Sequence, residues 1–327
     1  LQAVQGVCKK LFQGLMKHRF IKAALVLSAA IISLHACTGD KKKDDFVYDN
    51  PNSGTINISV DESFRPVIEE AIMVYEGTHP GTKIIAHYKP EADCFKDLYS
   101  DTSNRMIIVT RGLTRKESRF YTDSLNYTPF SDRVAWDAIT IVTNQKNTDT
   151  LYTLDDLQQL LQGKKGNAKK VVFDGLNATS TVRFAIDSIL HGGSFDTSVV
   201  KAVRSSKEVL NYIANNTDAI GLAGISWIGN PEDTAQVNLL KKMKIAYVEC
   251  KQCDSTPYVK PTQQSINTKR YPLVRGLYYI VKENYSGLGS GFAAFLKYER
   301  GQLIFRRAYL GPVMDFDVRK VEINEKL

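Results

Sequence analysis

The chain has 327 residues, of which 43% are hydrophobic and 24% are charged. This composition is typical of globular proteins and excludes collagen-like, coiled-coil and wholly disordered chains, while the length fits two domains or one large one with a sizeable core. The formal net charge is +8, but residues 1–36 contain five basic residues and no acidic one, so the remainder carries only +3. The excess of basic residues therefore does not indicate a nucleic-acid partner.

The N-terminal segment has the layout of a secretory signal. A basic stretch begins at Met16, the expected start of translation, and precedes twelve mainly apolar residues (23–34), too few for a membrane-spanning helix of about 20 residues. The sequence His-Ala-Cys that follows resembles a bacterial lipoprotein box, in which Cys37 receives the lipid after cleavage. We therefore expect upstream residues and a lipoprotein signal peptide over 1–37, and a flexible polar tether over 38–53. The alternative is an uncleaved, buried amphipathic helix.

From residue 54 the chain alternates strand-like and helix-like segments. Residues 55–60 alternate as a strand, and apolar residues at 64, 67, 68, 71, 72 and 75 then lie on one helical face, with Ser63 as the expected N-cap and Pro66 in the first turn. Further strands are expected at 83–88, 106–109, 138–143, 171–173, 219–227, 243–249 and 277–281, and helices at 95–99, 153–161, 181–190, 209–214 and 291–297, the last one ended by Gly301. This alternation predicts an α/β fold with largely parallel sheets.

Cysteine and glycine patterns give no support to a metal, a nucleotide cofactor or an enzyme. Cys250-Lys-Gln-Cys253 has the spacing of a redox pair or of half a zinc site, but no second CxxC or HxxxH supplies further ligands. We expect a local disulfide or two free thiols there. The glycines at 287–291 depart from GxGxxG and predict a turn before a helix, and those at 163–166 lack the Walker spacing. No GxSxG or HExxH motif occurs.

Hydroxyl-rich helix starts follow two of the predicted strands. Asp61-Glu-Ser-Phe64 opens the first helix, and Asn177-Ala-Thr-Ser-Thr181 opens a later one. The unpaired N–H groups of a helix N-terminus bind anions, and side-chain hydroxyls add donors. Arg183, in the first turn of the later helix, and Arg111, just after the strand that ends at Val109-Thr110, would add positive charge. The pattern indicates an oxyanion site; ordinary N-caps and solvated arginines are the alternative.

Seven segments occur in an order and spacing typical of one family. They are Ile58-Ser-Val-Asp-Glu-Ser-Phe64, Ile108-Val-Thr-Arg-Gly-Leu-Thr114, Val134-Ala-Trp-Asp-Ala-Ile-Thr-Ile-Val-Thr-Asn144, Asn177 to Arg183, Asp218-Ala-Ile-Gly-Leu222, Tyr271-Pro-Leu-Val-Arg275, and Gly301-Gln302 with Gly311-Pro312. In these segments the chain resembles the phosphate-specific ABC-transporter substrate-binding proteins, a branch of the type II periplasmic binding proteins, over about residues 54–315.

The resemblance implies an α/β fold of two lobes joined by two hinge crossovers, near residues 134–145 and 268–280. Lobe 1 would comprise 54–137 and 275–327, and lobe 2 would comprise 138–274. Inorganic phosphate would bind in the cleft, and the lobes would close on it before docking on the membrane permease of an ABC importer, with no catalysis and no cofactor. The protein would be a lipid-anchored lipoprotein of the cell envelope that faces the periplasm.

The resemblance also implies a set of binding residues. The family's backbone and hydroxyl donors fall here on Ser63, Phe64, Thr179, Ser180 and Thr181. Thr110, Arg111 and Arg183 complete the predicted phosphate site, and no residue is predicted to be catalytic or to bind a metal.

Two departures from the family pattern bear on selectivity. The family's proton-accepting Asp is missing near Asn104-Arg-Met106, and Asp174 stands in the segment where the family has an arginine before the hydroxyl trio. Ser180 also replaces a glycine of that trio. We expect Arg183 to compensate for the arginine, and Asp61, Glu62, Glu91 or Asp93 to accept the proton. Two alternatives to a phosphate importer stay open: an exported sensor or surface interaction protein of the same fold, and a receptor for another oxyanion such as sulfate.

Overall fold

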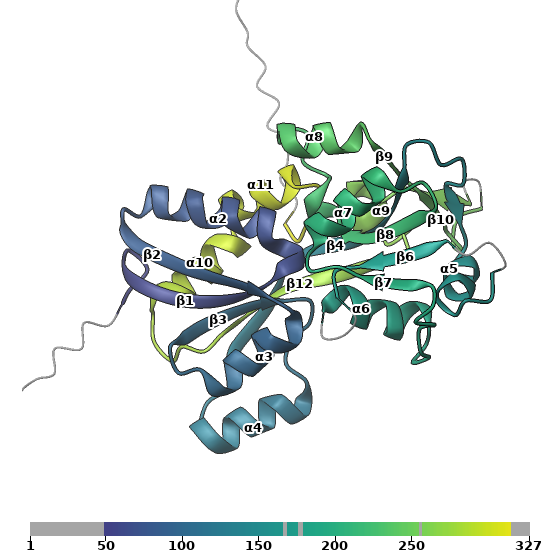
Figure 1. Ribbon diagram of the computed structural model, residues 1–327. Helices are drawn as coiled ribbons and strands as arrows, with labels where there is room; N and C mark the ends of the chain where they lie inside the picture. The colour runs from purple at the N-terminus through teal and green to yellow at the C-terminus, as the bar shows by residue number, and fades with distance from the viewer. Residues whose placement is uncertain (1–48, 166–168, 176–178, 255–256, 315–327) are drawn as a thin grey trace, which may run out of the picture. The chain divides into compact units, whose positions relative to one another are not determined.

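A mixed β-sheet organises the protein (Figure 1). The computed structural model describes residues 49–165, 169–175, 179–254 and 257–314, and the proposed signal peptide, Cys37 and residues 38–48 of the tether lie outside them. Within the described part the sheet has ten strands, in the order β2-β1-β3-β12-β4-β8-β6-β7, with β9 and β13 also paired to β4. The strands are β1 (Ser53–Asp61), β2 (Gly81–Lys89), β3 (Asn104–Val109), β4 (Phe130–Asn144), β6 (Lys170–Phe173), β7 (Val200–Ala202), β8 (Ala219–Gly224), β9 (Met243–Ile245), β12 (Val274–Val281) and β13 (Gly311–Pro312).

The two ends of this sheet are parallel and its centre is antiparallel. We call β2, β1 and β3 the first sheet half, and β8, β6 and β7 the second; within each half the strands pair in parallel. Between them, β12 and β4 pair antiparallel with each other and with their neighbours. The prediction of largely parallel sheets is therefore right at the ends and wrong in the centre, because β4 leads the chain out of the first half and β12 leads it back.

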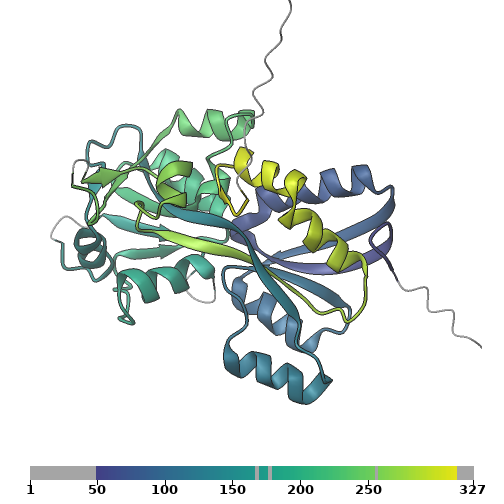
Figure 2. The same ribbon diagram turned by 180° about the vertical axis from the view of Figure 1, so that it is seen from behind.

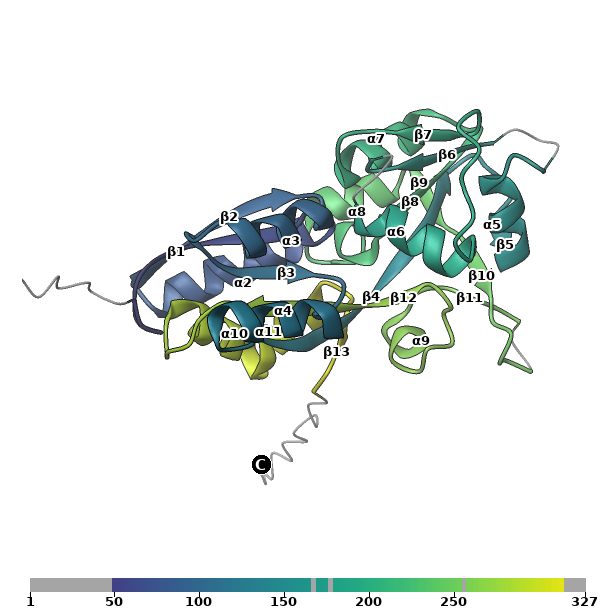
Figure 3. The same ribbon diagram turned by 90° about the horizontal axis from the view of Figure 1, so that it is seen from below.

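Helices cover both faces of each half (Figures 1, 2 and 3). On the first half, α2, α10 and α11 lie on one face and α3 on the other, with α4 beyond α3; on the second half, α7 and α6 lie on opposite faces. The helices are α2 (Arg65–Thr78), α3 (Glu91–Ser100), α4 (Arg115–Leu125), α5 (Leu154–Leu161), α6 (Ser180–Phe184), α7 (Ser206–Asn215), α8 (Thr234–Leu240), α9 (Gln263–Asn267), α10 (Leu288–Lys297) and α11 (Glu299–Arg307). Short 3-10 turns occupy Glu62–Phe64 and Ile225–Trp227, and a π-helical turn, Ala185–Ile189, extends α6.

The periodicities read from the sequence agree with the core. The α2 face is buried at Val67, Ile68, Ala71, Ile72 and Tyr75 as predicted. The strand expected at 243–249 is instead two short ones, β9 and β10 (Tyr247–Glu249), and β10 joins β5 (Leu151–Tyr152) and β11 (Tyr258–Val259) in a small second sheet.

Three local features differ from expectation. Helix α4 was not predicted, although the capping box of Thr114 and Glu117 marks its start. Gly301 does not end a helix; it lies inside α11, where a Cβ would come within 2.4 Å of the Phe295 carbonyl oxygen, so it allows α11 to approach α10 closely. The end of the predicted tether packs on the fold, because Leu288 N donates to Asp49 (2.7 Å) and Tyr75 Oη donates to the carbonyl of Pro51 (2.6 Å).

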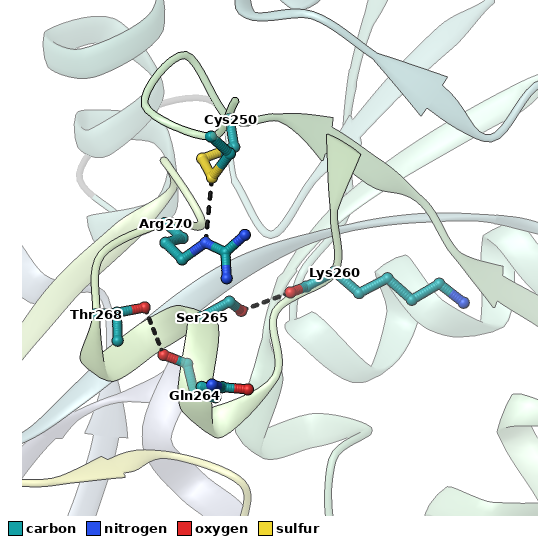
Figure 4. Close-up of a disulfide and its surroundings, with 7 residues drawn as sticks. Cys250, Lys260, Gln264, Ser265, Thr268 and Arg270 are labelled. Atoms are coloured by element: carbon teal, nitrogen blue, oxygen red, sulfur yellow. Dashed lines mark hydrogen bonds between the residues drawn. A yellow bond between two sulfur atoms is a disulfide. The ribbon is translucent and has the colours of Figure 1, made fainter. Parts of the chain in front are cut away.

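Cys250 and Cys253 form a disulfide, which confirms one of the two alternatives left open for this pair (Figure 4). Arg270 Nε donates to Cys253 Sγ at 3.1 Å and so ties the loop to the segment that follows α9. Cys94 is a buried free cysteine. None of the helices in the described part is long and apolar enough to cross a membrane.

Candidate functional site

The two predicted hydroxyl-rich helix starts meet between the sheet halves. Asp61, at the end of β1, accepts a hydrogen bond from Ser63 N (3.0 Å) and is the cap of the 3-10 turn. The expectation that Ser63 is the N-cap was therefore wrong: its hydroxyl points instead toward the second half, where Ser63 Oγ lies 3.1 Å from Ser180 Oγ at the start of α6. Both serines are completely buried.

A buried arginine completes this centre. Arg275, at the start of β12, donates from Nη1 to Ser180 Oγ (2.8 Å) and from Nε to Asp137 Oδ2 on β4 (2.7 Å), and its guanidinium lies 5.1 Å from the ring centroid of Phe64. Arg275 Nη2 is buried without a hydrogen-bond partner in the described part of the chain, and so is Asp61 Oδ2. We call Asp61, Ser63, Ser180 and Arg275 the buried centre. It combines a fixed positive charge, two hydroxyls and a carboxylate, which is a donor and acceptor set suited to an oxyanion.

Arg275 is not among the site residues predicted from the sequence, where it belongs to the segment 271–275 at an expected hinge crossover. The available signal was a charged residue at the start of an apolar strand, since a buried charge is rare unless it is paired or binds a ligand.

Asp61 is the one of the four predicted proton acceptors that belongs to the buried centre. Burial, followed by the charge of Glu91, raises the pKa of Asp61 from 3.8 to about 7, and the charge of Arg275 acts in the opposite direction. This carboxyl therefore changes protonation near neutral pH. When ionised, it can accept a hydrogen bond from an O–H group of a ligand. When protonated, it can donate a hydrogen bond to a ligand oxygen that carries no proton.

The predicted donors Thr179 and Thr181 face a carboxylate. Their hydroxyls donate to Asp174 Oδ1 (3.0 Å) and Oδ2 (3.3 Å), and Thr179 also caps α6 through Val182 N. Burial raises the pKa of Asp174, which occupies the segment where the resembled family has an arginine. The arginine beside this helix start is instead Arg275 of β12, which donates to Ser180, while Asp174 accepts from the two threonine hydroxyls.

The other predicted residues, Thr110, Arg111 and Arg183, lie around a second group of acidic side chains. Arg183 donates to Glu91 Oε2 (2.7 Å) and to Thr110 Oγ1 (2.5 Å), and Thr110 N donates to Glu91 Oε1 (2.8 Å). Burial would raise the pKa of Glu91, but the hydrogen bonds and charge of Arg183, with Thr110, outweigh it and lower that pKa. Arg111 forms a bidentate ion pair with Glu117 (2.8 and 2.9 Å) over the ring of Phe95. Both arginines are thus paired with carboxylates, as Arg275 is with Asp137.

The remaining two predicted acceptors lie elsewhere. Glu62 Oε2 accepts hydrogen bonds from Ser206 N (3.1 Å) and Ser206 Oγ (2.8 Å) and links the two sheet halves. Burial raises the pKa of Glu62. Asp93 is exposed on α3.

A pocket of about 430 Å³ adjoins the buried centre. It lies at the C-terminal ends of the parallel strands of both sheet halves, where open α/β sheets bind ligands. The pocket is lined from the first half by Asp61, Glu62, Arg65, Tyr88, Lys89 and Pro90, and from the second by Asp174, Thr179, Arg204, Ser205, Lys207 and Trp227.

Neither the glycine-rich segment 287–291 nor a cluster of metal-binding side chains forms a second ligand site in the described part of the chain. The helix expected after a turn at 287–291 begins earlier than predicted: Gly287 is the N-cap of α10 and the other two glycines lie within it. The N–H groups of Gly289 and Ser290 donate to the carboxylate of Glu283 (3.0 and 2.8 Å). The chain's own acid thus occupies that helix start. Among the residues that the structure describes, no group of three or more His, Cys, Asp or Glu side chains could hold a metal ion.

Open α/β sheets bind ligands outside the carboxyl ends of their strands, so the buried centre lies where this class of fold places a ligand site. The chain belongs to the PBP (periplasmic binding protein) superfamily, whose domain model matches residues 48–299. It is 21% identical over 276 residues to the phosphate-binding protein PstS of Borreliella burgdorferi, covering 80% of this chain and 91% of the relative.

Solved structures show the same fold. A Clostridium perfringens protein, described as a phosphate ABC transporter substrate-binding protein with bound phosphate, superposes with a TM-score of 0.64 at 19% identity, over 80% of this chain and all of that one. An ABC-type phosphate transport receptor from Vibrio cholerae gives a TM-score of 0.58 at 19% identity, over 79% of this chain and all of that one. The predicted type II periplasmic-binding-protein fold is therefore confirmed.

Proposed function

We propose that the protein is the substrate-binding component of a phosphate ABC importer, which captures inorganic phosphate in the buried centre between the sheet halves and delivers it to a membrane permease without catalysis. The observation that carries this proposal is Arg275, whose Nη2 is buried and unpartnered in the described part of the chain beside the hydroxyls of Ser63 and Ser180. The phosphate-binding relatives support the choice of ligand.

The chemistry of the centre suits a desolvated phosphate. An anion removed from water needs charge-assisted hydrogen bonds to offset its lost hydration, and Arg275, Ser63 and Ser180 supply them. Hydrogen phosphate also carries one O–H group, which would donate a hydrogen bond to the ionised carboxylate of Asp61. Sulfate has no such proton, so an ionised Asp61 would repel it and provide selectivity.

Of the predicted site residues, Ser63, Phe64 and Ser180 belong to this proposed site. Thr179 and Thr181 take part indirectly, since their hydroxyls donate to Asp174. Arg183, on α6 of the second half, donates to Glu91 and Thr110 of the first half, and these contacts would hold the halves together when the ligand is bound. Arg111 would support α4 through Glu117.

We also propose that the protein is exported, lipidated at Cys37 and anchored in the cell envelope facing the periplasm. The basic stretch, the short apolar run and the lipoprotein-like box support this. Expression in a bacterial host with detergent phase partitioning would test it: the wild-type protein should enter the detergent phase, and a Cys37→Ser variant should stay in the aqueous phase. Equal partitioning of the two would refute the anchor.

A second candidate ligand is another oxyanion such as sulfate, favoured by one observation. With its pKa at about 7, Asp61 is partly protonated at neutral pH and can then donate to a bare oxyanion oxygen. The third candidate, an exported sensor or surface interaction protein of the same fold, would bind little or no phosphate.

Calorimetric titration of the purified protein with phosphate, and then with sulfate as competitor, tests the proposal. Binding of phosphate that survives excess sulfate at pH 8 is the expected result. Equal competition would favour a general oxyanion receptor, and the absence of both heat and thermal stabilisation would refute anion capture.

A further inference from the structure

We propose that Gly224 is a specificity-determining residue of the buried centre, because its missing side chain leaves room for an anion oxygen beside Arg275. Gly224 is the last residue of β8 and is buried. The inference rests on the proposed function, since it takes Arg275 as the group that binds the anion. It goes beyond that function by naming a residue of the second sheet half that lets the centre admit a tetrahedral anion.

A Cβ on Gly224 would lie among polar groups of the buried centre. Its position is 3.4 Å from Arg275 Nη2, 3.5 Å from Asp137 Oδ2 and 3.5 Å from the carbonyl oxygen of Ser63. Arg275 Nη2 is buried without a hydrogen-bond partner in the described part of the chain. The nitrogen that we expect to bind the anion therefore adjoins a position that carries no side chain.

The fold itself does not require a glycine at position 224. The backbone of Gly224 has φ −63° and ψ 144°, an extended conformation that any residue adopts. A Cβ would meet its neighbours at ordinary van der Waals distances, so an alanine fits without a clash. Glycine in a strand is less stable than alanine, because it loses more conformational freedom on folding. A glycine that neither backbone nor packing demands is typical of a place where a ligand approaches closely.

Gly221, three residues earlier in the same strand, shows the contrast. A Cβ there would come within 2.7 Å of Val209 Cγ1 and 2.8 Å of Ile213 Cγ1, which is closer than side-chain carbons approach one another. Packing against α7 therefore explains the glycine at position 221. No such contact explains the glycine at position 224.

The groups around Gly224 are held in place by buried hydrogen bonds. Ser226 Oγ donates to the carbonyl oxygen of Ser63 at 3.1 Å, and Gln236 Nε2 donates to the carbonyl oxygen of Ser226 at 3.1 Å. Arg275 is likewise fixed by its two buried partners. A hydrogen-bonded anion oxygen would lie about 2.7–2.9 Å from Arg275 Nη2. A methyl group at position 224 would compete with that oxygen for space, because the surrounding groups are not free to move away.

Calorimetric titration of purified Gly224→Ala with phosphate and with sulfate tests the inference, at pH 6, where both anions should bind. We expect the affinity for phosphate to fall about 10–100-fold, as the loss of a hydrogen bond from a charged donor predicts. Phosphate and sulfate are tetrahedral anions of similar size, so sulfate should lose affinity by the same factor. Without anion, Gly224→Ala should melt at the wild-type temperature. Gly221→Ala is the matched control: it should lower the melting temperature and leave the phosphate affinity of the folded protein unchanged.

The outcomes separate this inference from the proposed function. Unchanged phosphate affinity in Gly224→Ala would overturn the inference and leave the proposed function in place. A Gly224→Ala protein that does not fold would also overturn it, because the glycine would then be a requirement of packing. Loss of phosphate binding with sulfate binding retained would refute a steric role, since added volume acts on both anions. If the wild-type protein binds neither anion, both proposals fail; if it binds phosphate alone, the phosphate result decides.

Discussion

Arg275 Nη1 donates to Ser180 Oγ at 2.8 Å, and this contact joins the strand that returns to the first sheet half with the helix start of the second. The same guanidinium is paired with Asp137, so its position is fixed from two sides. Because both partners are buried, the arginine is held in place before any ligand arrives, and little ordering cost remains for binding.

The first prediction concerns this ion pair. Arg275→Ala alone would leave Asp137 as an uncompensated buried charge and should lower the free energy of unfolding by about 3–5 kcal/mol. The double variant Arg275→Gln/Asp137→Asn replaces both charges with neutral groups of similar size and should recover most of that loss. We expect the double variant to fold, as judged by circular dichroism and thermal melts, yet to show no calorimetric binding of phosphate. Unchanged phosphate affinity in it would remove Arg275 from the site.

The second prediction concerns anion selectivity and pH. With the pKa of Asp61 at about 7, sulfate should bind below pH 7, where the carboxyl can donate, and lose affinity above it. Phosphate should keep its affinity at pH 8, because its own O–H then donates to the carboxylate. The charged groups that influence Asp61 are Glu91 and Arg275. Asp61→Asn preserves a cap for Ser63 N and should bind sulfate equally at pH 6 and pH 8; a wild-type pH profile in this variant would contradict the assignment.

The third prediction concerns the stability of the ligand-free protein. Since the folded state holds the Asp61 proton up to about pH 7 whereas the unfolded chain releases it near 3.8, the folded state binds more protons between these values. The free energy of unfolding should therefore fall as pH rises from about 4 to about 7. Urea denaturation at several pH values measures it, and Asp61→Asn should flatten the slope. Burial also raises the pKa of Glu62 and Asp174, so a smaller slope should persist; a rising stability across this window would refute the account.

The fourth prediction concerns packing of the second sheet half. A Cβ on Gly221 of β8 would come within 2.7 Å of Val209 Cγ1 and 2.8 Å of Ile213 Cγ1 on α7. Gly221→Ala should thus overpack this contact and destabilise the protein by about 1–3 kcal/mol. Gly77→Ala in α2, where nothing lies within 4 Å, is the matched control and should be neutral or stabilising by up to about 1 kcal/mol. Chemical denaturation compares the two, and equal effects would show that the α7–β8 contact is not tight.

Much of the fold could be read from local patterns. The α2 face, the capping box at Thr153 and the Ser205 cap of α7 are properties of short segments, and the structure has each of them. The antiparallel centre could not be read in this way, because the direction of β4 and β12 depends on which sheet half each strand leaves and enters. Helix α4 carries few apolar residues, so periodicity gave no sign of it.

The site could be predicted only in part, because some of its residues follow local patterns and others depend on how distant segments pack. Ser63 and Ser180 follow strands and open helices, a pattern visible in the sequence. Their meeting at 3.1 Å depends on the packing of two distant segments. Arg183 lies in a helix start and was therefore predicted as a site residue, whereas Arg275 lies at the start of a strand and was not. Only the fold shows that Arg183 is paired with Glu91, and that Arg275 Nη2 has no hydrogen-bond partner in the described structure.

A crystal structure of the protein grown with phosphate would locate the anion directly. We expect tetrahedral density within hydrogen-bond distance of Arg275 Nη2, Ser63 Oγ and Ser180 Oγ, with one oxygen facing Asp61 Oδ2. Phosphate density beside Arg183 and Arg111 instead, with the buried centre unchanged, would contradict it.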